Sequence, residues 1–383
     1  MEIAKHLQSI QPSYIREILS EATAPGVISL AGGLPAPEFF PINLMQDSLA
    51  TLHQKKALFQ YGETAGYPPF LTWIRENYQL NSSQKALITT GSQQALDLIA
   101  RTYMNAGDGV AMEEPAYLGA LQVFGMTQSK IYTVAQDKFG PNVDELERLF
   151  AKKHIKFFYA VPDFHNPSGV CWDIETRQKV GELCQKYHVT LIEDAPYREI
   201  RFAGEALPLA SSFCPDNAFV LRSFSKIATP GMRIGFVSAP SVWIDELIKV
   251  KQASDLHSSL PMQEVLLALL QHPEYPSHLK KLCEVYGERY KVLSTELRDK
   301  LPNCHFDDVD GGMFIWLTLP KETGKPMDIA KRCIQNKVAI VPGCVFYPQE
   351  NGEPDTLTIR LNFSHASTTD LKEAVRRLAE VIG

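Results

Sequence analysis

A lysine lies near the middle of the chain, in a turn between two apolar runs that are each typical of a buried strand. The turn reads SFSKIATPGMR over residues 223–233, and its lysine is Lys226. Burial, or a neighbouring cation such as Arg233, lowers the pKa of a lysine and leaves its amine free to attack a carbonyl group. The hydroxyls of Ser223 and Ser225 and the guanidinium of Arg233 can together hold a phosphate. The turn therefore indicates a Schiff-base lysine beside a phosphate site, as pyridoxal 5′-phosphate (PLP) would require; the alternative is a surface turn with an ordinary lysine and arginine.

The elements around this turn predict an α/β fold. Apolar runs rich in β-forming residues occur at 86–90, 109–112, 130–134, 155–161, 189–193, 218–222 and 234–238. Helical patterns lie between several of them, at 92–104, 115–125, 142–152 and 174–187. This alternation predicts a mostly parallel seven-stranded sheet with helices on both faces, in which ligands bind beyond the carboxyl ends of the strands.

The C-terminal part of the chain has a different pattern. Helices are expected at 242–253, 261–270 and 274–300, strands at 313–319, 338–341 and 356–362, and a last helix at 369–381. The final hundred or so residues are therefore expected to form a smaller α+β domain. Near the N-terminus, an amphipathic helix is expected at 13–19 and another helix at about 69–78.

Polar side chains stand directly after several of the predicted strands. Ser92 opens a helix, and the free N–H groups of a helix N-terminus bind anions; a plain N-cap is the alternative. Tyr117 opens the next helix, where its ring either stacks on a flat heterocycle or packs in the core. Asn166 precedes a proline, and its amide can donate to a phenolic oxygen, although Asn-Pro is also a common turn signal.

Two further residues carry a charge in an apolar setting. Asp194 ends a buried run, which is unfavourable unless the carboxylate is paired with a cation. A protonated pyridine nitrogen would pair with it, and Tyr197 could point the same way; a salt bridge to Arg198 or Arg201 is the alternative. Arg360 lies inside a late apolar strand, where its forked guanidinium matches a substrate carboxylate or pairs with a structural acid.

Two loops near the N-terminus complete the set of candidates. The glycines of the loop AGGLPAP, which include Gly33, allow a ligand to approach the backbone closely, or they form a simple turn. Tyr61 begins the loop YGETAGY and is either a ligand contact or a packing aromatic.

Composition excludes several classes of protein. The formal net charge is −6 with both signs interspersed, which argues against a nucleic-acid-binding surface. There are 7 cysteines and no C-x-x-C pair, which is typical of reduced intracellular proteins. The chain contains no signal-peptide pattern and no apolar stretch near the roughly 20 residues that span a bilayer. We therefore expect a cytoplasmic protein with no membrane and no nucleic-acid partner.

Taken together, these stretches resemble the fold type I, class I/II PLP-dependent aminotransferases. Within that group the chain is most similar to the 2-aminoadipate (LysN-like) and kynurenine/aminoadipate aminotransferase branch. The resemblance covers essentially the whole chain. It is carried by SYIREIL, VISLAGGLPAPEFFP, QYGETAGY, TTGSQQALDLI, EEPAYLGAL, VPDFHNPSG, EDAPY, SFSKIATPGMRIGF and IRLNFS. The sequence departs from the usual pattern at His165, where the branch often has Gln, and at Ser168, where it has Thr.

The resemblance implies a role for each candidate. Lys226 would bind the cofactor as a Schiff base and then move the substrate proton, while Asp194 would pair with the pyridine nitrogen. The other expected cofactor contacts are Asn166 and Tyr197 at the phenolic oxygen, Tyr117 on the ring, and Ser92, Gln93, Ser223, Ser225 and Arg233 at the phosphate, joined by Tyr61 of the partner subunit in a homodimer with shared active sites. The expected substrate contacts are Arg360, Asn166 and Gly33.

The implied organisation is an N-terminal segment at 1–44 that packs on the small domain and borders the path of the substrate, a large PLP-binding domain at 45–280 and a small domain at 281–383. The implied activity is transfer of the amino group of an L-amino acid to a 2-oxo acid, expected to be 2-oxoglutarate, by a ping-pong mechanism. Loop residues such as Tyr14, Ile15 and Leu34 suggest a bulky or apolar donor. The alternatives are a C–S lyase or another PLP reaction on the same scaffold, and a sensor related to transcription regulators. A nucleotide-binding α/β enzyme finds no support, since neither G-x-G-x-x-G nor G-x-x-x-x-G-K-[ST] occurs.

Overall fold

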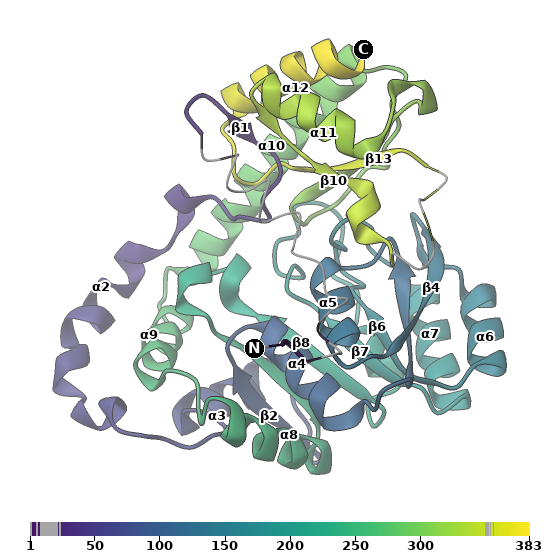
Figure 1. The fold of residues 1–383 in the computed structure, drawn as a ribbon. Coiled ribbons are helices and arrows are strands. Elements are labelled where there is room, and N and C mark those ends of the chain that lie inside the picture. The colour runs from purple at the N-terminus through teal and green to yellow at the C-terminus, as the bar shows by residue number, and fades with distance from the viewer. Residues whose placement is uncertain are drawn as a thin grey trace.

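The computed structural model describes residues 2–4, 7, 22, 24–348, 352, 354 and 356–383. The helix expected at 13–19, with Tyr14 and Ile15, lies outside the described residues. Within these ranges the chain forms a large sheet covered by helices and a smaller body at the C-terminal end (Figure 1).

The central sheet contains every strand that the apolar runs predict. Its strands are β2 (Gln84–Thr89), β3 (Gly109–Glu114), β4 (Lys130–Asp137), β5 (Gly140–Pro141), β6 (Ile155–Ala160), β7 (Thr190–Asp194), β8 (Ala218–Ser223) and β9 (Gly235–Pro240). Their order across the sheet is β2-β9-β8-β7-β6-β3-β4-β5, so the sheet has 8 strands. The strand beyond the expected seven is β5, whose two residues are too short to leave a pattern in the sequence.

Strand direction explains how the lysine turn is built. The strands from β8 through β7, β6 and β3 to β4 are parallel, whereas β9 is antiparallel to both β8 and β2. A short connection can join only antiparallel neighbours, because a parallel pair needs a crossover. The turn after β8 therefore stays at the carboxyl-terminal edge of the parallel strands, beside the polar residues that follow β6 and β7.

Helices cover both faces of this sheet, as the alternation predicts (Figure 1). Along β6, Phe157 and Tyr159 belong to one apolar cluster, while Phe158 and Ala160 belong to the other, because successive side chains point to opposite faces. The first face is covered by α4 (Ser92–Tyr103), α5 (Leu118–Met126) and α8 (Ser241–Ser254), and the second by α6 (Val143–Lys152) and α7 (Ile174–Lys186). Beside the sheet lie α2 (Ile42–Thr51), α3 (Pro68–Asn77) and α9 (Leu260–Leu270).

The C-terminal part is an α+β body, which lies at the top of Figure 1. Its helices are α10 (Tyr275–Lys300), α11 (Pro326–Gln335) and α12 (Thr368–Ile382), and its strands are β10 (Phe314–Thr318), β11 (Val338–Ala339), β12 (Val341–Pro342) and β13 (Thr358–Asn362). β13 pairs antiparallel with both β10 and β12. The N-terminal strand β1 (Ile28–Ser29) pairs in parallel with β11.

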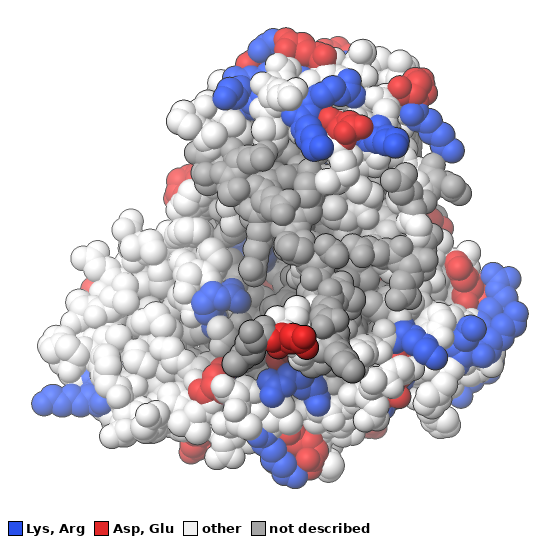
Figure 2. All heavy atoms as spheres, in the orientation of Figure 1, with Lys and Arg blue, Asp and Glu red and all other residues white. Residues whose placement is uncertain are grey.

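The division at residues 45 and 281 stays a prediction, since residue 281 lies inside α10 and residue 45 inside α2. No helix of the described residues is long and apolar enough to cross a membrane. On the face shown in Figure 2, basic and acidic side chains are interspersed.

Candidate functional site

The residues singled out in the sequence come together around one cavity. Its volume is about 310 Å³, and it lies at the carboxyl-terminal edge of the central sheet, between the sheet and β13. The predicted site residues that line it are Gly33, Ser92, Gln93, Tyr117, Asn166, Asp194, Tyr197, Ser223, Ser225, Lys226, Arg233 and Arg360. Tyr61 is the candidate that does not: its side chain is 79% exposed and lies outside the cavity.

Lys226 ends a single helical turn, Phe224–Lys226, that directly follows β8. Its ammonium Nζ donates to the carbonyl oxygen of Gly33 over 2.7 Å and lies 5.8 Å from the centre of the Tyr197 ring. Burial, followed by the charges of Arg360 and Arg233, lowers the pKa of Lys226 to about 8. Roughly a tenth of the amine is therefore uncharged at neutral pH, so the residue can act as a nucleophile or a base.

Asp194, the last residue of β7, has one oxygen bound and one oxygen unpaired. Oδ2 accepts a hydrogen bond from the Tyr159 hydroxyl over 2.9 Å, whereas the buried Oδ1 has no hydrogen-bond partner among the described residues. Burial raises the pKa of Asp194 to about 7, and the hydrogen bond from Tyr159 opposes this effect. The alternative salt bridge does not form, because Arg198 and Arg201 pair with Asp163 instead. A protonated ring nitrogen would supply the missing donor, so the site fits the pyridine end of PLP.

Tyr159 is a functional residue that the sequence analysis missed. It lies in β6, inside the apolar run IKFFYAV, where a tyrosine reads as one more core residue. The alternation along β6 carries the signal that could have revealed it, since Tyr159 and Val161 share a face and both line the cavity.

The N-terminus of α4 faces the cavity through Ser92 and Gln93. Gly91 precedes the helix with φ +81°, a conformation that favours glycine, and a Cβ there would come within 3.0 Å of Arg233 Nη2. The close approach brings a guanidinium to a helix N-terminus that already attracts anions. This end of the cavity therefore fits a phosphate.

The lysine turn supplies the other side of this anion site. The Ser225 backbone N–H donates to Ser223 Oγ over 3.3 Å, which orients the Ser223 hydroxyl within the turn. Arg233 has a positive φ of +53°. Its Nη1 lies 3.5 Å from Ser225 Oγ, and its Nη2 lies 3.0 Å from the carbonyl oxygen of Thr90. A guanidinium held between the turn and the strand end is placed to pair with a phosphate.

Two aromatic side chains form a wall of the cavity. Tyr117 directly precedes α5. Its hydroxyl donates to Gln93 Oε1 over 3.3 Å. Its ring stacks on that of Tyr159, with centroids 6.4 Å apart and planes at 24°. Tyr117 therefore contacts another aromatic ring and lines the cavity, and its stacking on a flat ligand stays a prediction.

Arg360 reaches the cavity from β13 and is 2% exposed. Its Nη1 donates to Asn166 Oδ1 over 2.7 Å and its Nη2 to the carbonyl oxygen of Ala31, while Nε has no hydrogen-bond partner among the described residues. No Asp or Glu oxygen of the described residues lies within 4.0 Å of this guanidinium, which packs on the Phe314 ring at 4.3 Å. Burial lowers the pKa of Arg360 to about 10. A buried guanidinium without an acid partner in the described part of the chain fits a ligand carboxylate rather than the structural acid considered as the alternative.

The two departures from the family pattern contact each other. His165 Nδ1 lies 2.8 Å from Ser168 Oγ, and Nε2 lies 3.7 Å from Glu113 Oε2. Burial lowers the pKa of His165 to about 3, so the ring is neutral at physiological pH. Neither residue lines the cavity; they support the loop that carries Asn166.

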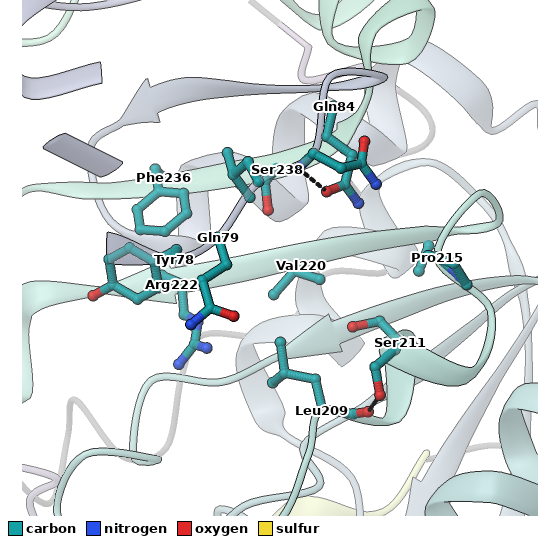
Figure 3. Close-up of a pocket in the computed structure, with 14 residues that line it drawn as sticks. Tyr78, Gln79, Gln84, Leu209, Ser211, Pro215, Val220, Arg222, Phe236 and Ser238 are labelled. Atoms are coloured by element: carbon teal, nitrogen blue, oxygen red, sulfur yellow. Dashed lines mark hydrogen bonds between the residues drawn. The ribbon is translucent and has the colours of Figure 1, made fainter. Parts of the chain in front are cut away.

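A second cavity, of about 290 Å³, lies on the sheet near β8 and β9 (Figure 3). Val220 and Phe236 belong to its walls, and its one guanidinium, Arg222, is already paired with Glu199 at 3.1 Å. It contains none of the predicted site residues. The predicted site residues therefore gather at the first cavity and not at this one.

Comparison with known proteins identifies the family that the sequence resembles. The family described as aminotransferase class I and II matches residues 35–378, and the chain belongs to this family. Aromatic-amino-acid aminotransferase 1 of Thermococcus litoralis is 35% identical over 97% of this chain and 92% of its own length. The chain is therefore a PLP-dependent aminotransferase of fold type I.

Two solved structures share the whole fold. Kynurenine aminotransferase from Pyrococcus horikoshii, solved in complex with PMP, has a TM-score of 0.93 and 33% identity and covers 99% of this chain and 96% of its own. The α-aminoadipate aminotransferase LysN from Thermus thermophilus, complexed with N-(5′-phosphopyridoxyl)-L-leucine, has a TM-score of 0.91 and 31% identity, with 99% and 97% covered. The expected branch is confirmed.

Proposed function

We propose that this aminotransferase binds PLP in the cavity with Lys226 as the point of covalent attachment, and that it passes the amino group of an L-amino acid to 2-oxoglutarate. The observation that carries this assignment is the buried, unpaired Oδ1 of Asp194, which needs a donor that a protonated ring nitrogen would supply. Ser223, Ser225, Arg233 and the N-terminus of α4 would hold the phosphate at the opposite end.

Each side chain then has a definite task. When bound, PLP supplies an electron sink for the charge that develops on the substrate α-carbon. Asp194 would keep a proton on the ring nitrogen, and Asn166 and Tyr197 would donate to the phenolic oxygen. Arg360 binds the substrate α-carboxylate through two parallel hydrogen bonds and so orients the α-carbon. Lys226 Nζ takes the α-proton and returns a proton, for which its lowered pKa suits it.

The donor amino acid is the finer part of the proposal. The relatives are named for aromatic amino acids, kynurenine and α-aminoadipate. Among the cavity residues that the structure describes, the cations are Lys226, Arg233 and Arg360, and each already has a task, while Leu34 and Pro35 add apolar surface. These cavity residues support a bulky or apolar side chain in the donor, and the second carboxylate of 2-oxoglutarate would need a cation from outside them. Bleaching of the cofactor absorbance by leucine, phenylalanine, kynurenine, aminoadipate or glutamate, each added alone, tests the choice, because glutamate with 2-oxoglutarate would give no net reaction. A strong preference for an acidic donor would contradict the proposal.

The role of Lys226 is tested by Lys226→Ala. The wild-type protein should absorb visible light through its bound cofactor, and this absorbance should bleach when an amino-acid donor is added. The variant should lose turnover, and borohydride should no longer fix the cofactor to the peptide that contains residue 226. Full activity of Lys226→Ala would show that the assignment is wrong.

We further propose a homodimer with shared sites, in which Tyr61 of the partner subunit contacts the phosphate. The support is that Tyr61 is exposed and packs edge-on against His257, with ring centroids 6.1 Å apart, rather than entering its own cavity. Mixing Lys226→Ala and Tyr61→Ala subunits should form dimers with one complete site and regain activity. If each variant is inactive alone and the mixture is too, the shared site is refuted.

A cytoplasmic location is also part of the proposal. Its support is a set of cysteines without disulfides, namely Cys171, Cys184, Cys214, Cys283, Cys304 and Cys333. Cell fractionation with thiol labelling would test it.

A further inference from the structure

Lys251 is a lysine with no exposed surface, although it lies in α8 on the outside of the central sheet. Its ammonium Nζ donates to Gln94 Oε1 over 3.0 Å and to Asp255 Oδ1 and Oδ2 over 2.8 and 2.9 Å. Burial lowers the pKa of Lys251, and the bonds to Asp255 oppose this effect. A buried ammonium is unfavourable unless all its donors are used, so these contacts must be maintained together.

Gln94 lies in the first turn of α4, and its side-chain amide is fully engaged. Its Oε1 accepts from the backbone N–H of Thr90 over 2.7 Å as well as from Lys251, and its Nε2 donates to Asp255 Oδ2 over 2.6 Å. We call Gln94, Lys251 and Asp255 the Lys251 cluster. It ties α8 to the residues that immediately precede and open α4.

The Lys251 cluster is linked to the proposed phosphate site through a single residue, Thr90. Thr90 donates its N–H to Gln94 and accepts at its carbonyl oxygen from Arg233 Nη2 over 3.0 Å. Lys251, Gln94, Thr90 and Arg233 therefore form a continuous chain of hydrogen bonds that ends at the cavity. Lys251 itself does not line the cavity, so any effect on a ligand must act through Gln94 and Thr90.

We propose that Lys251 is a positioning residue for phosphate recognition: through Gln94 and Asp255 it holds the segment 90–94 in the geometry that aims Arg233 and the N–H groups of α4 at the cofactor phosphate. The proposal rests on the proposed assignment of the phosphate end of the cavity. A residue that merely tied α8 to α4 would stabilise the fold without favouring a phosphorylated ligand over an unphosphorylated one.

The test compares two ligands that differ only in the phosphate. The dissociation constants of the apoenzyme for PLP and for pyridoxal are measured for the wild type, for Lys251→Met and for Lys249→Met. Methionine fills the space of the lysine stem but cannot donate. Lys249 is the matched control, because it lies on the same helix, is 68% exposed and pairs with Glu246 on the surface. Lys251→Met should bind PLP about tenfold more weakly, the change expected for about 1.4 kcal/mol. Its affinity for pyridoxal, and both affinities of Lys249→Met, should stay within about twofold of the wild type.

Inorganic phosphate gives a second readout. It should compete with PLP for the wild-type apoenzyme and compete more weakly for Lys251→Met. If Lys251→Met does not fold, Asp255→Asn and Gln94→Met, which remove one partner each, should show the same selective loss for PLP.

The outcomes separate the two proposals. If Arg233→Met weakens PLP selectively and the variants of the Lys251 cluster leave PLP affinity unchanged, or weaken PLP and pyridoxal equally, the positioning role is refuted and the phosphate site stands. If Arg233→Met does not alter the preference for PLP over pyridoxal, the phosphate site itself is misassigned.

Discussion

Arg360 and Asn166 are joined by a hydrogen bond of 2.7 Å from guanidinium Nη1 to amide Oδ1. Arg360 belongs to β13 of the C-terminal body, and Asn166 follows β6 of the central sheet. The Nδ2 atom of Asn166 lies 3.4 Å from the hydroxyl oxygen of Tyr197. The group proposed to bind substrate is therefore fixed directly to the groups proposed to bind cofactor, so the geometry of one constrains the other.

Replacing Arg360 by methionine should weaken substrate binding selectively. A charge-assisted pair with a carboxylate is lost, which corresponds to a rise of roughly 10- to 100-fold in KM for the amino acid. The cofactor absorbance of the resting enzyme should persist. Arg376→Met is the control, because Arg376 is half exposed on α12 and pairs with Glu373 and Glu380. An unchanged KM for Arg360→Met would remove Arg360 from the substrate site.

Tyr159→Phe should shift the pH dependence of turnover. The hydrogen bond from the Tyr159 hydroxyl to Asp194 Oδ2 favours the ionised form of Asp194. Losing this bond should therefore raise the pKa of Asp194 above the wild-type value of about 7. The ionised fraction near neutral pH then falls, and kcat should drop by about three- to tenfold and recover as the pH is raised. Tyr103→Phe is the control, since its hydroxyl donates to the Trp243 carbonyl oxygen away from the cavity. A uniform loss at all pH values would point to disturbed packing instead.

The attachment of PLP to the apoenzyme should report the pKa of Lys226. Only the uncharged amine reacts, so the rate should rise with pH and level off above a midpoint near about 8, well below the ordinary 10.5 of lysine. The charge of Arg360 contributes to this lowering, so the midpoint in Arg360→Met should move to higher pH. Stopped-flow absorbance measures both profiles. A wild-type midpoint near 10.5 would contradict the burial of the amine.

Glu113 should make the fold less stable as the pH rises. Burial raises its pKa from 4.5 to about 8, although Val161 N–H and Trp172 Nε1 donate to its two oxygens. Between these two values the folded state retains a proton that the unfolded state has released, so this group's contribution to stability falls as pH increases. The Tm of the wild type should therefore drop relative to that of Glu113→Gln between pH values of about 5 and about 8. Parallel Tm curves for the two proteins would exclude the shift.

The fold was largely predictable because its main signals are local. Each long strand of the central sheet is an apolar run bounded by polar residues, and most helices show the 3.6-residue period. The direction of β9 depends on the length of the connection from β8 and on tertiary pairing, and a run of apolar letters does not encode it. The sequence did not predict the helix α11. This helix is only ten residues long and buries only Ile329, Ala330 and Cys333, so its periodic signal is short.

The site was predictable where a residue's type conflicted with its surroundings. A lysine, an aspartate and an arginine in apolar segments each demanded a partner, and all three line the cavity. Tyr159 and Lys251 escaped detection for opposite reasons. Tyr159 fits an apolar strand too well, and Lys251 occupies a helix position that looks exposed until α4 is packed against it. Contacts between distant segments determine both roles.

The hydrogen bonds that close the N-terminal loop over the cavity also order events during synthesis. Arg360 donates to the carbonyl oxygen of Ala31, which lies 329 residues earlier in the sequence. Likewise, β1 can pair only after β11 has been synthesised. At a synthesis rate of about 5–20 residues per second, that interval lasts roughly 15 to 70 seconds. The lysine turn and the strands beside it emerge earlier, so the proposed phosphate-binding residues are synthesised before the proposed substrate-binding residue Arg360.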